Sequence, residues 1–293
     1  MFSTACAIAR NYTLPIIISH RNANGECGAG IGTFVVVNDD GWFVTAFHVI
    51  SQIEKLNKAN IDYKELLIKR DKIEHDATLL SHTKKKALNS LKIDPNSIDN
   101  FSVFMGWIGV SIGVVHVIPD IDLAVGQLIN FDKTKVKDYP HFKDSSKPME
   151  QGTSLCKLGF PFHNIKPTFQ EGKGFELPVG SFPIPIFPIE GIFTRKVNIN
   201  ILNPPTYPLM FIETSSPGLR GQSGGPTFDI HGTIWAIQSQ TRHLKLGFGS
   251  DSQNNKEAEH LRNQYLNVGW GIHAQTVTAF LNEKNIKFQL STY

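Results

Sequence analysis

The sequence predicts a mainly β fold that carries a helical insertion in its first half and one α-helix near its end. Short runs of β-branched and aromatic residues, such as 16–18 and 34–37, alternate with Gly, Asn and Asp turns, which is typical of strands. Between about residues 51 and 92, the apolar residues recur at helical intervals among Lys and Glu, so we expect a helical insertion there. A second helical pattern predicts the closing helix at about 274–284.

Other segments complete this outline. Asn38-Asp39-Asp40-Gly41 lies between two strand-like runs and predicts a hairpin turn. Residues 182–188 contain three prolines, each without a ladder donor, which favours a surface loop or an edge. Two β-rich halves flank residues 140–150. We therefore expect an N-terminal unit over 1–145, which includes the insertion, and a C-terminal unit over 146–293 with the closing helix.

Composition excludes several classes of protein. With 293 residues, 41% of them hydrophobic, the chain can bury a large core. Its 29 basic and 26 acidic side chains are too evenly balanced to produce the positive electrostatic field of a nucleic-acid-binding protein. No apolar run approaches the ~20 residues of a membrane span.

The cysteines and the N-terminus indicate the compartment. Three cysteines are too few for a disulfide framework, and residues 1–12 lack a secretory pattern, so we expect a cytoplasmic protein. The histidines and cysteines lack zinc-binding spacing, and we expect neither a metal nor a cofactor.

Three segments supply the parts of a nucleophilic hydrolase. His48 follows a predicted strand, Asp122 directly precedes an apolar strand, and Ser223 lies in the glycine turn Gly221-Gln222-Ser223-Gly224-Gly225-Pro226. A single His or Asp near a strand is most often structural. The six specified positions around the serine are more specific, and the three segments together favour a serine activated by a base.

These segments, read as Thr45-Ala46-Phe47-His48, Asp122-Leu123-Ala124 and 221–226, resemble the signatures of the trypsin-like serine peptidases. The Gly-rich entry into the strand at 28–35 and Leu158-Gly159-Phe160-Pro161 are similar to bacterial HtrA-type protease domains. The resemblance runs from about residue 14 to 284. It implies two packed six-stranded antiparallel β-barrels with an active site in the cleft between them.

The resemblance also implies a role for each residue of the site. His48 would act as the base, Asp122 would orient it, and Ser223 would attack the peptide bond and form an acyl-enzyme. The amides of Gly221 and Ser223 would form the oxyanion hole. Substrate contacts would come from Pro217, Gly218, Ser239, Gln240, Thr241 and Gly269.

The chain departs from parts of the family pattern. Gln222 stands where the enzymes that mature by cleavage have an Asp, and no cysteine flanks His48, so we expect neither that activation route nor that disulfide. Residues 215–218 lack the Asp that selects Lys or Arg, and Arg242 and His243 lie beside the expected substrate strand. We therefore expect an uncharged or acidic residue before the cut. Since the chain ends at Tyr293, we expect a stand-alone, bacterial-style peptidase without a PDZ domain.

Alternatives and partners remain open at this stage. The pattern Gly221-x-Ser223-x-Gly225 also fits the nucleophile elbow of an α/β-hydrolase esterase. A catalytically silent scaffold that binds a protein through its cleft is a second alternative. For a peptidase, the partners are a protein or peptide substrate and, at insertion 51–92, an activating protein or another copy of the chain. Residues 247–263 predict a long loop that gates the pocket.

Overall fold

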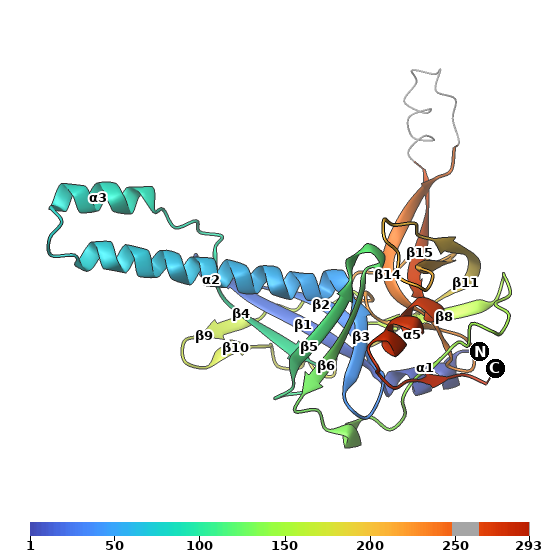
Figure 1. Cartoon of the computed structure of the whole chain (residues 1–293). Helices are drawn as coiled ribbons and strands as arrows, with labels where there is room; N and C mark the ends of the chain where they lie inside the picture. The colour runs from blue at the N-terminus through green and yellow to red at the C-terminus, as the bar shows by residue number, and fades with distance from the viewer. Residues whose placement is uncertain (248–263, 293) are drawn as a thin grey trace.

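The computed structural model describes residues 1–247 and 264–292. The loop predicted at 247–263 lies outside the described residues, apart from Gly247. The described chain is mainly β, with two large sheets, a small two-stranded sheet, a helical insertion and a C-terminal helix (Figure 1), and the sequence predicts this class.

The first sheet contains six antiparallel strands from the N-terminal half of the chain. Its spatial order is β4-β1-β2-β3-β6-β5, and the ladder stays open between β4 and β5 in the described chain, so the sheet forms a half-barrel. The predicted hairpin turn joins β2 to β3, with the Gly41 amide donating to the Asn38 carbonyl over 3.2 Å. The strands are β1 (Thr13–Asn22), β2 (Cys27–Val36), β3 (Trp42–Ala46), β4 (Ile98–Met105), β5 (Ser111–Ile118) and β6 (Leu123–Ile129).

The second sheet closes into a ring of six antiparallel strands, in the order β13-β8-β11-β12-β15-β14 and back to β13. Two short strands, β7 (His141–Phe142) and β16 (Gln289–Leu290), extend it in parallel from β14. A separate hairpin pairs β9 (Thr168–Gln170) with β10 (Gly174–Glu176). The ring strands are β8 (Ser154–Gly159), β11 (Phe187–Asn198), β12 (Met210–Thr214), β13 (Pro226–Phe228), β14 (Ile234–Lys245) and β15 (Tyr265–His273).

Two short helices pack against the second sheet. The closing helix α5 (Ala274–Glu283) follows the prediction, and the His273 Nδ1 atom caps it by accepting from the Gln275 amide over 3.0 Å. Helix α1 (Ser3–Arg10) was not predicted. Its Cys6 Sγ lies 3.9 Å from Cys156 Sγ on β8. A helix of eight residues has little stability alone, so this packing, which the sequence does not reveal, maintains it.

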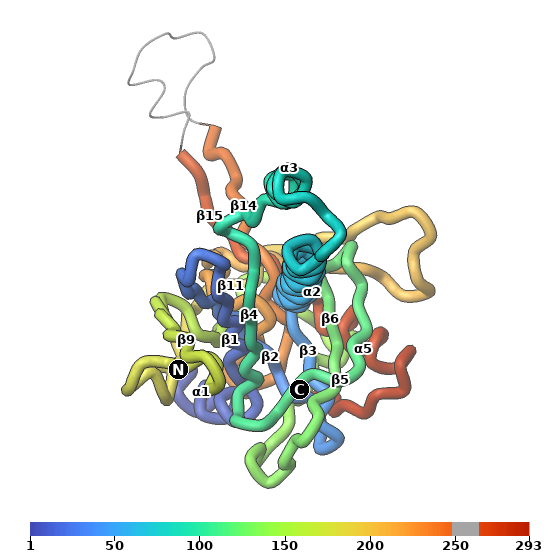
Figure 2. The backbone as a smooth tube through the Cα atoms, turned by 90° about the vertical axis from the view of Figure 1, so that its left-hand side faces the viewer, coloured from blue at the N-terminus to red at the C-terminus, as the bar shows by residue number. Residues whose placement is uncertain are grey.

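The helical insertion forms a projecting hairpin, which we call the arm (47–90). It consists of α2 (Phe47–His75) and α3 (Ser81–Ser90), and α2 begins four residues before the predicted start at about 51. The Asn60 side chain holds α2 on β4 through the Ile98 carbonyl, 3.2 Å away. Beyond that point the arm leaves the sheet, and α3 folds back along α2 (Figures 1 and 2). None of the described helices combines the length and apolarity that a membrane crossing requires.

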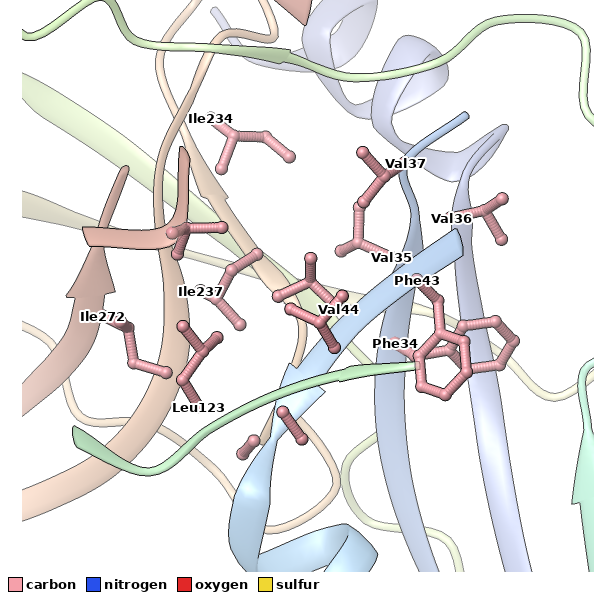
Figure 3. Close-up of a cluster of buried hydrophobic side chains, with 14 of the residues drawn as sticks. Phe34, Val35, Val36, Val37, Phe43, Val44, Leu123, Ile234, Ile237 and Ile272 are labelled. Atoms are coloured by element: carbon pink, nitrogen blue, oxygen red, sulfur yellow. The ribbon is translucent and has the colours of Figure 1, made fainter. Parts of the chain in front are cut away.

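One hydrophobic cluster joins the two sheets. Val44 and Leu123 from the first sheet face Ile234, Ile237 and Ile272 from the second (Figure 3), and all five are fully buried. Burial of this shared apolar surface stabilises the contact between the sheets. The end of β3, the start of β6 and the middle of β14, which carry the candidate site, are therefore held in fixed positions.

Candidate active site

His48 and Asp122 meet at the end of the first sheet. The His48 Nδ1 atom lies 2.9 Å from Asp122 Oδ2, and the imidazole is half exposed while the carboxylate is mostly buried. An ionised carboxylate only accepts hydrogen bonds, so the pair requires the proton of a neutral imidazole on Nδ1. The Nε2 atom of His48 is then left with a free lone pair, which can accept a proton.

The backbone around Asp122 also fixes the start of α2. Asp122 has a left-handed φ of 58° and directly precedes β6. Its carbonyl accepts from the Phe47 amide over 2.8 Å, and its Oδ1 atom accepts from the His48 amide over 2.8 Å. A negative charge at a helix N-terminus is favourable because the helix dipole is positive there. Asp122 therefore caps the arm and orients the His48 ring at the same time.

Ser239 on β14 connects this pair to Ser223. The Ser239 hydroxyl donates to Asp122 Oδ2 over 2.5 Å, and its carbonyl accepts a long 3.4 Å hydrogen bond from the Ser223 hydroxyl. In the described chain the Ser223 hydroxyl forms no hydrogen bond to His48. The three residues singled out in the sequence thus gather at one place, with the serine hydroxyl turned toward Ser239.

The serine turn leaves two backbone amides free. Gly221 and Gly224 have φ angles of +93° and +86°, which glycine adopts without steric cost. The Thr33 side chain on β2 holds the turn by donating to the Gly221 carbonyl over 2.6 Å. No acceptor in residues 1–247 and 264–292 binds the amides of Gly221 and Ser223. Such free donors beside a hydroxyl can stabilise a developing negative charge.

This turn predicts that Gly221→Ala lowers the rate of hydrolysis by on the order of 100-fold. A Cβ atom at Gly221 would lie 2.2 Å from the Phe160 carbonyl oxygen, so the turn must shift and the amides with it. The rate on a peptide substrate and the melting temperature report the effect. Gly152→Ala is the matched control, because Gly152 has a φ of +85° but no atom within 4 Å of the added Cβ. An unchanged rate in Gly221→Ala would contradict the assignment of these amides.

A pocket of about 380 Å³ opens beside Ser223. Four of the six residues predicted to contact substrate line it: Gly218, Ser239, Gln240 and Thr241. The other two, Pro217 and Gly269, do not line it and lie against Lys157 instead. Leu219, Arg220 and Gln238 also line the pocket and were not predicted from the sequence, whereas His243, which was expected beside the substrate strand, lines it as well.

Lys157 is the group near this pocket that the sequence analysis missed. It lies on β8 and is only 1% exposed, and burial lowers the pKa of its amine to about 7. The signal was present, because Lys157 interrupts the otherwise apolar strand Leu155-Cys156-Lys157-Leu158. A lysine in a strand that is buried on both sides is rare unless its amine has a specific environment.

The structure excludes the esterase alternative. Ser223 is followed by strand β13 at Pro226 rather than by a helix, and the surrounding sheet is antiparallel. A nucleophile elbow requires a strand before the serine and a helix after it. As for metals, no group of three or more ligating side chains gathers within residues 1–247 and 264–292.

Comparisons with known proteins find one matching family model and similar solved structures. The family model described as "Trypsin-like peptidase domain" matches residues 32–237. Among solved structures, the chain is similar to the active form of the Rv3671c protease from M. tuberculosis, with 14% identity, a TM-score of 0.46, and coverage of 98% of this chain and 87% of that one. The inactive form of Rv3671c gives 14% identity, a TM-score of 0.45, and coverage of 96% and 92%. No curated protein matches in sequence.

The family model spans well over half of the chain, including His48, Asp122 and Ser223. The two main sheets and their shared core have the trypsin-like fold that the resemblance implies. The chain belongs to the trypsin-like peptidase family and is a serine protease.

Proposed function

We propose that the protein is an endopeptidase that cleaves peptide bonds with His48, Asp122 and Ser223 as its catalytic triad. The observation that supports this most strongly is the hydrogen-bonded chain from His48 through Asp122 to Ser239, which lies beside a serine turn with two free amides. The oxyanion hole of the proposal consists of the amides of Gly221 and Ser223.

The proposed reaction has two halves. Ser223 Oγ attacks the peptide carbonyl while His48 Nε2 takes the hydroxyl proton, and the oxyanion accepts hydrogen bonds from the two amides. The C–N bond then breaks, the proton passes from Nε2 to the leaving amine, and an acyl-enzyme ester remains. A water molecule, deprotonated by His48, attacks this ester. The C–O bond breaks and the proton returns to Ser223 Oγ, while Asp122 stabilises the imidazolium in both halves.

The proposal includes a resting arrangement of Ser223 that a partner protein can shift toward the active one. The Ser223 hydroxyl donates to the Ser239 carbonyl, and the reaction requires it to turn to His48 Nε2. A hydrogen bond of 3.4 Å is long, so this exchange costs little. Because His48 is in the first turn of α2, a protein that binds the arm can act directly on the imidazole position.

The arm is the proposed contact for that activating protein or for another copy of the chain. Its distal half exposes apolar side chains that the barrels do not cover, with Ile68 56% and Leu80 68% exposed. The arm also holds itself together, since Arg70 Nη1 donates to the Leu88 carbonyl over 3.0 Å. We place the enzyme in a reducing, cytoplasmic compartment, which its three free thiols support.

Replacing residues 64–92 by a short Gly/Ser linker tests this role of the arm. The variant keeps Asn60, which attaches α2 to β4. We expect an unchanged melting temperature and unchanged hydrolysis of a short peptide, together with loss of concentration-dependent association in sedimentation or of activation by a partner protein. If association and activation are both retained without the distal arm, the proposed contact is wrong.

Labelling with a fluorophosphonate tests the enzyme directly, because only an activated serine reacts. We expect one adduct by intact mass, located at Ser223 by peptide mapping, and no adduct in Ser223→Ala or His48→Ala. The catalytically silent scaffold predicts the opposite, a folded wild-type protein that remains unlabelled. The geometry of His48 and Asp122 favours the enzyme over this alternative.

A further inference from the structure

The amine of Lys157 is enclosed by the loop that leads to the serine turn. Its Nζ atom donates to the Ser216 carbonyl and to the Ser216 hydroxyl, each over 2.6 Å, and to the Pro217 carbonyl over 3.4 Å. These acceptors are neutral. The loop therefore provides hydrogen-bond acceptors for the Lys157 ammonium group but no negative charge to compensate its positive charge.

No carboxylate in the described chain compensates this charge. Within residues 1–247 and 264–292, the ion pairs do not include Lys157. Glu213, a buried carboxylate on β12, is already paired with Arg195 over 2.9 Å and accepts from Trp270 Nε1 over 3.0 Å. Burial of an unpaired charge is costly, which explains why the pKa of Lys157 falls to about 7. A negative charge brought to this amine would remove that cost.

Lys157 does not line the pocket beside Ser223, but its amine contacts Pro217 and Gly269, which neighbour residues of that lining. Gly269 on β15 pairs with Thr241, which lines the pocket. A Cβ atom at Gly269 would lie 2.9 Å from Lys157 Nζ, so the bare glycine leaves the ammonium group next to this wall. The Thr241 hydroxyl donates to the Gly218 carbonyl over 2.6 Å. The pocket wall and the amine are linked through neighbouring residues, because Pro217 precedes Gly218 and Gly269 pairs with Thr241.

The pocket lining contains a hydroxyl donor and a positive charge. The donor is Thr241, and Arg220 and His243 also line the pocket, whereas the Gln238 amide nitrogen already donates to the Gln240 and Trp270 carbonyls. Arg242, the next residue of β14 after Thr241, does not line the pocket and lies over the Trp270 ring at 4.7 Å. No Asp or Glu is among the residues that line the pocket. This field repels a Lys or Arg side chain and attracts a carboxylate.

From these contacts we propose that Lys157 selects substrates with an acidic side chain, Glu or Asp, at the residue before the cleaved bond. This proposal rests on the proposed peptidase function and names the residue that decides its specificity. The Thr241 hydroxyl turns from the Gly218 carbonyl to the entering carboxylate, and the ammonium group exchanges its longest hydrogen bond, to the Pro217 carbonyl, for the substrate oxygen. The pocket thereby gains the anion that the described chain does not supply.

The test uses two peptides that differ only in having Glu or Gln before the bond, plus a third with Leu. Gln has the shape of Glu without its charge. It could also donate to the Gln238 Oε1 atom, which is buried without a partner. We expect wild-type kcat/KM to favour Glu over Gln by on the order of 100-fold, because a charged pair in a desolvated pocket is strongly discriminating. Equal rates for Glu and Gln, or a preference for Gln, would overturn the proposal.

The variant Lys157→Met retains most of the apolar stem and removes the charge. We expect it to lose the Glu preference by on the order of 100-fold while hydrolysis of the Leu peptide changes little. Lys196→Met, which removes an exposed positive charge from β11, is the matched control and should retain the preference. Fluorophosphonate labelling of Ser223 and the melting temperature report folding.

The outcomes separate the two proposals. Persistent Glu preference in a labelled, folded Lys157→Met variant would exclude Lys157 as the selecting residue, while the peptidase function would stand. If Lys157→Met does not fold, the Glu, Gln and Leu rates of the wild type still decide whether an acidic side chain is preferred. A wild type that cleaves none of the three peptides and takes no fluorophosphonate would overturn the peptidase function itself, and the specificity proposal with it.

Discussion

Ser223→Ala is expected to lower kcat of peptide hydrolysis by on the order of 10⁶-fold, and His48→Ala by a similar factor. The reason is that the two side chains act in one step, in which the hydroxyl attacks only as the imidazole removes its proton. The double variant should therefore be no slower than either single variant. Steady-state rates on one peptide substrate, with KM measured separately, test this expectation.

Two controls accompany this experiment. Ser102→Ala removes an exposed hydroxyl on β4 and should leave the rate unchanged. Thermal unfolding should show that the Ser223 and His48 variants fold, since neither side chain belongs to the hydrophobic core. Losses that multiply in the double variant would mean that the two residues act independently, and the triad would be wrong.

Asp122→Asn is expected to lower kcat by about 10⁴-fold while the protein remains folded. An Asn at this position places its NH₂ group either against His48 Nδ1 or against the His48 backbone amide, which Asp122 Oδ1 now accepts from. The first arrangement moves the imidazole proton to Nε2, where the base is needed. Asp122 also accepts from Ser239 over 2.5 Å, and an amide nitrogen facing Ser239 cannot accept that bond.

Ser239→Ala separates the loss of the Ser239 hydrogen bond to Asp122 from the change of the His48 tautomer. It removes the hydroxyl that donates to Oδ2 but leaves the carboxylate and its contact with His48 in place. We expect a smaller loss of kcat than in Asp122→Asn, because the proton stays on Nδ1. Rates for both variants on the same peptide, together with melting temperatures, give the comparison. If Ser239→Ala lowers kcat as much as Asp122→Asn does, the orientation of the Asp122 carboxylate by Ser239, rather than the tautomer of His48, determines kcat.

Local patterns were sufficient for much of the fold. Turn residues such as Asn38 and Gly41, and β-branched runs such as 16–18 and 34–37, predicted strands of the first sheet because strand and hairpin signals are encoded within a few residues. Helix α1 was missed because its stability depends on contacts with β8, which is 150 residues away at the Cys6 and Cys156 contact. Similarly, α2 begins at Phe47 because Asp122 caps it, and no local signal reports a cap from a distant segment.

The candidate site also has features that local sequence predicts and features that only the tertiary structure decides. By itself, the sequence determined the family and which His, Asp and Ser to select, because the glycine turn around Ser223 and the segments around His48 and Asp122 are contiguous motifs. Only the tertiary structure decided that the Ser223 hydroxyl faces Ser239, that Pro217 and Gly269 abut an amine, and that this amine belongs to Lys157. The physical reason is that the charge and hydrogen bonding of a buried group depend on what the fold packs around it, and those neighbours lie tens of residues apart in the chain.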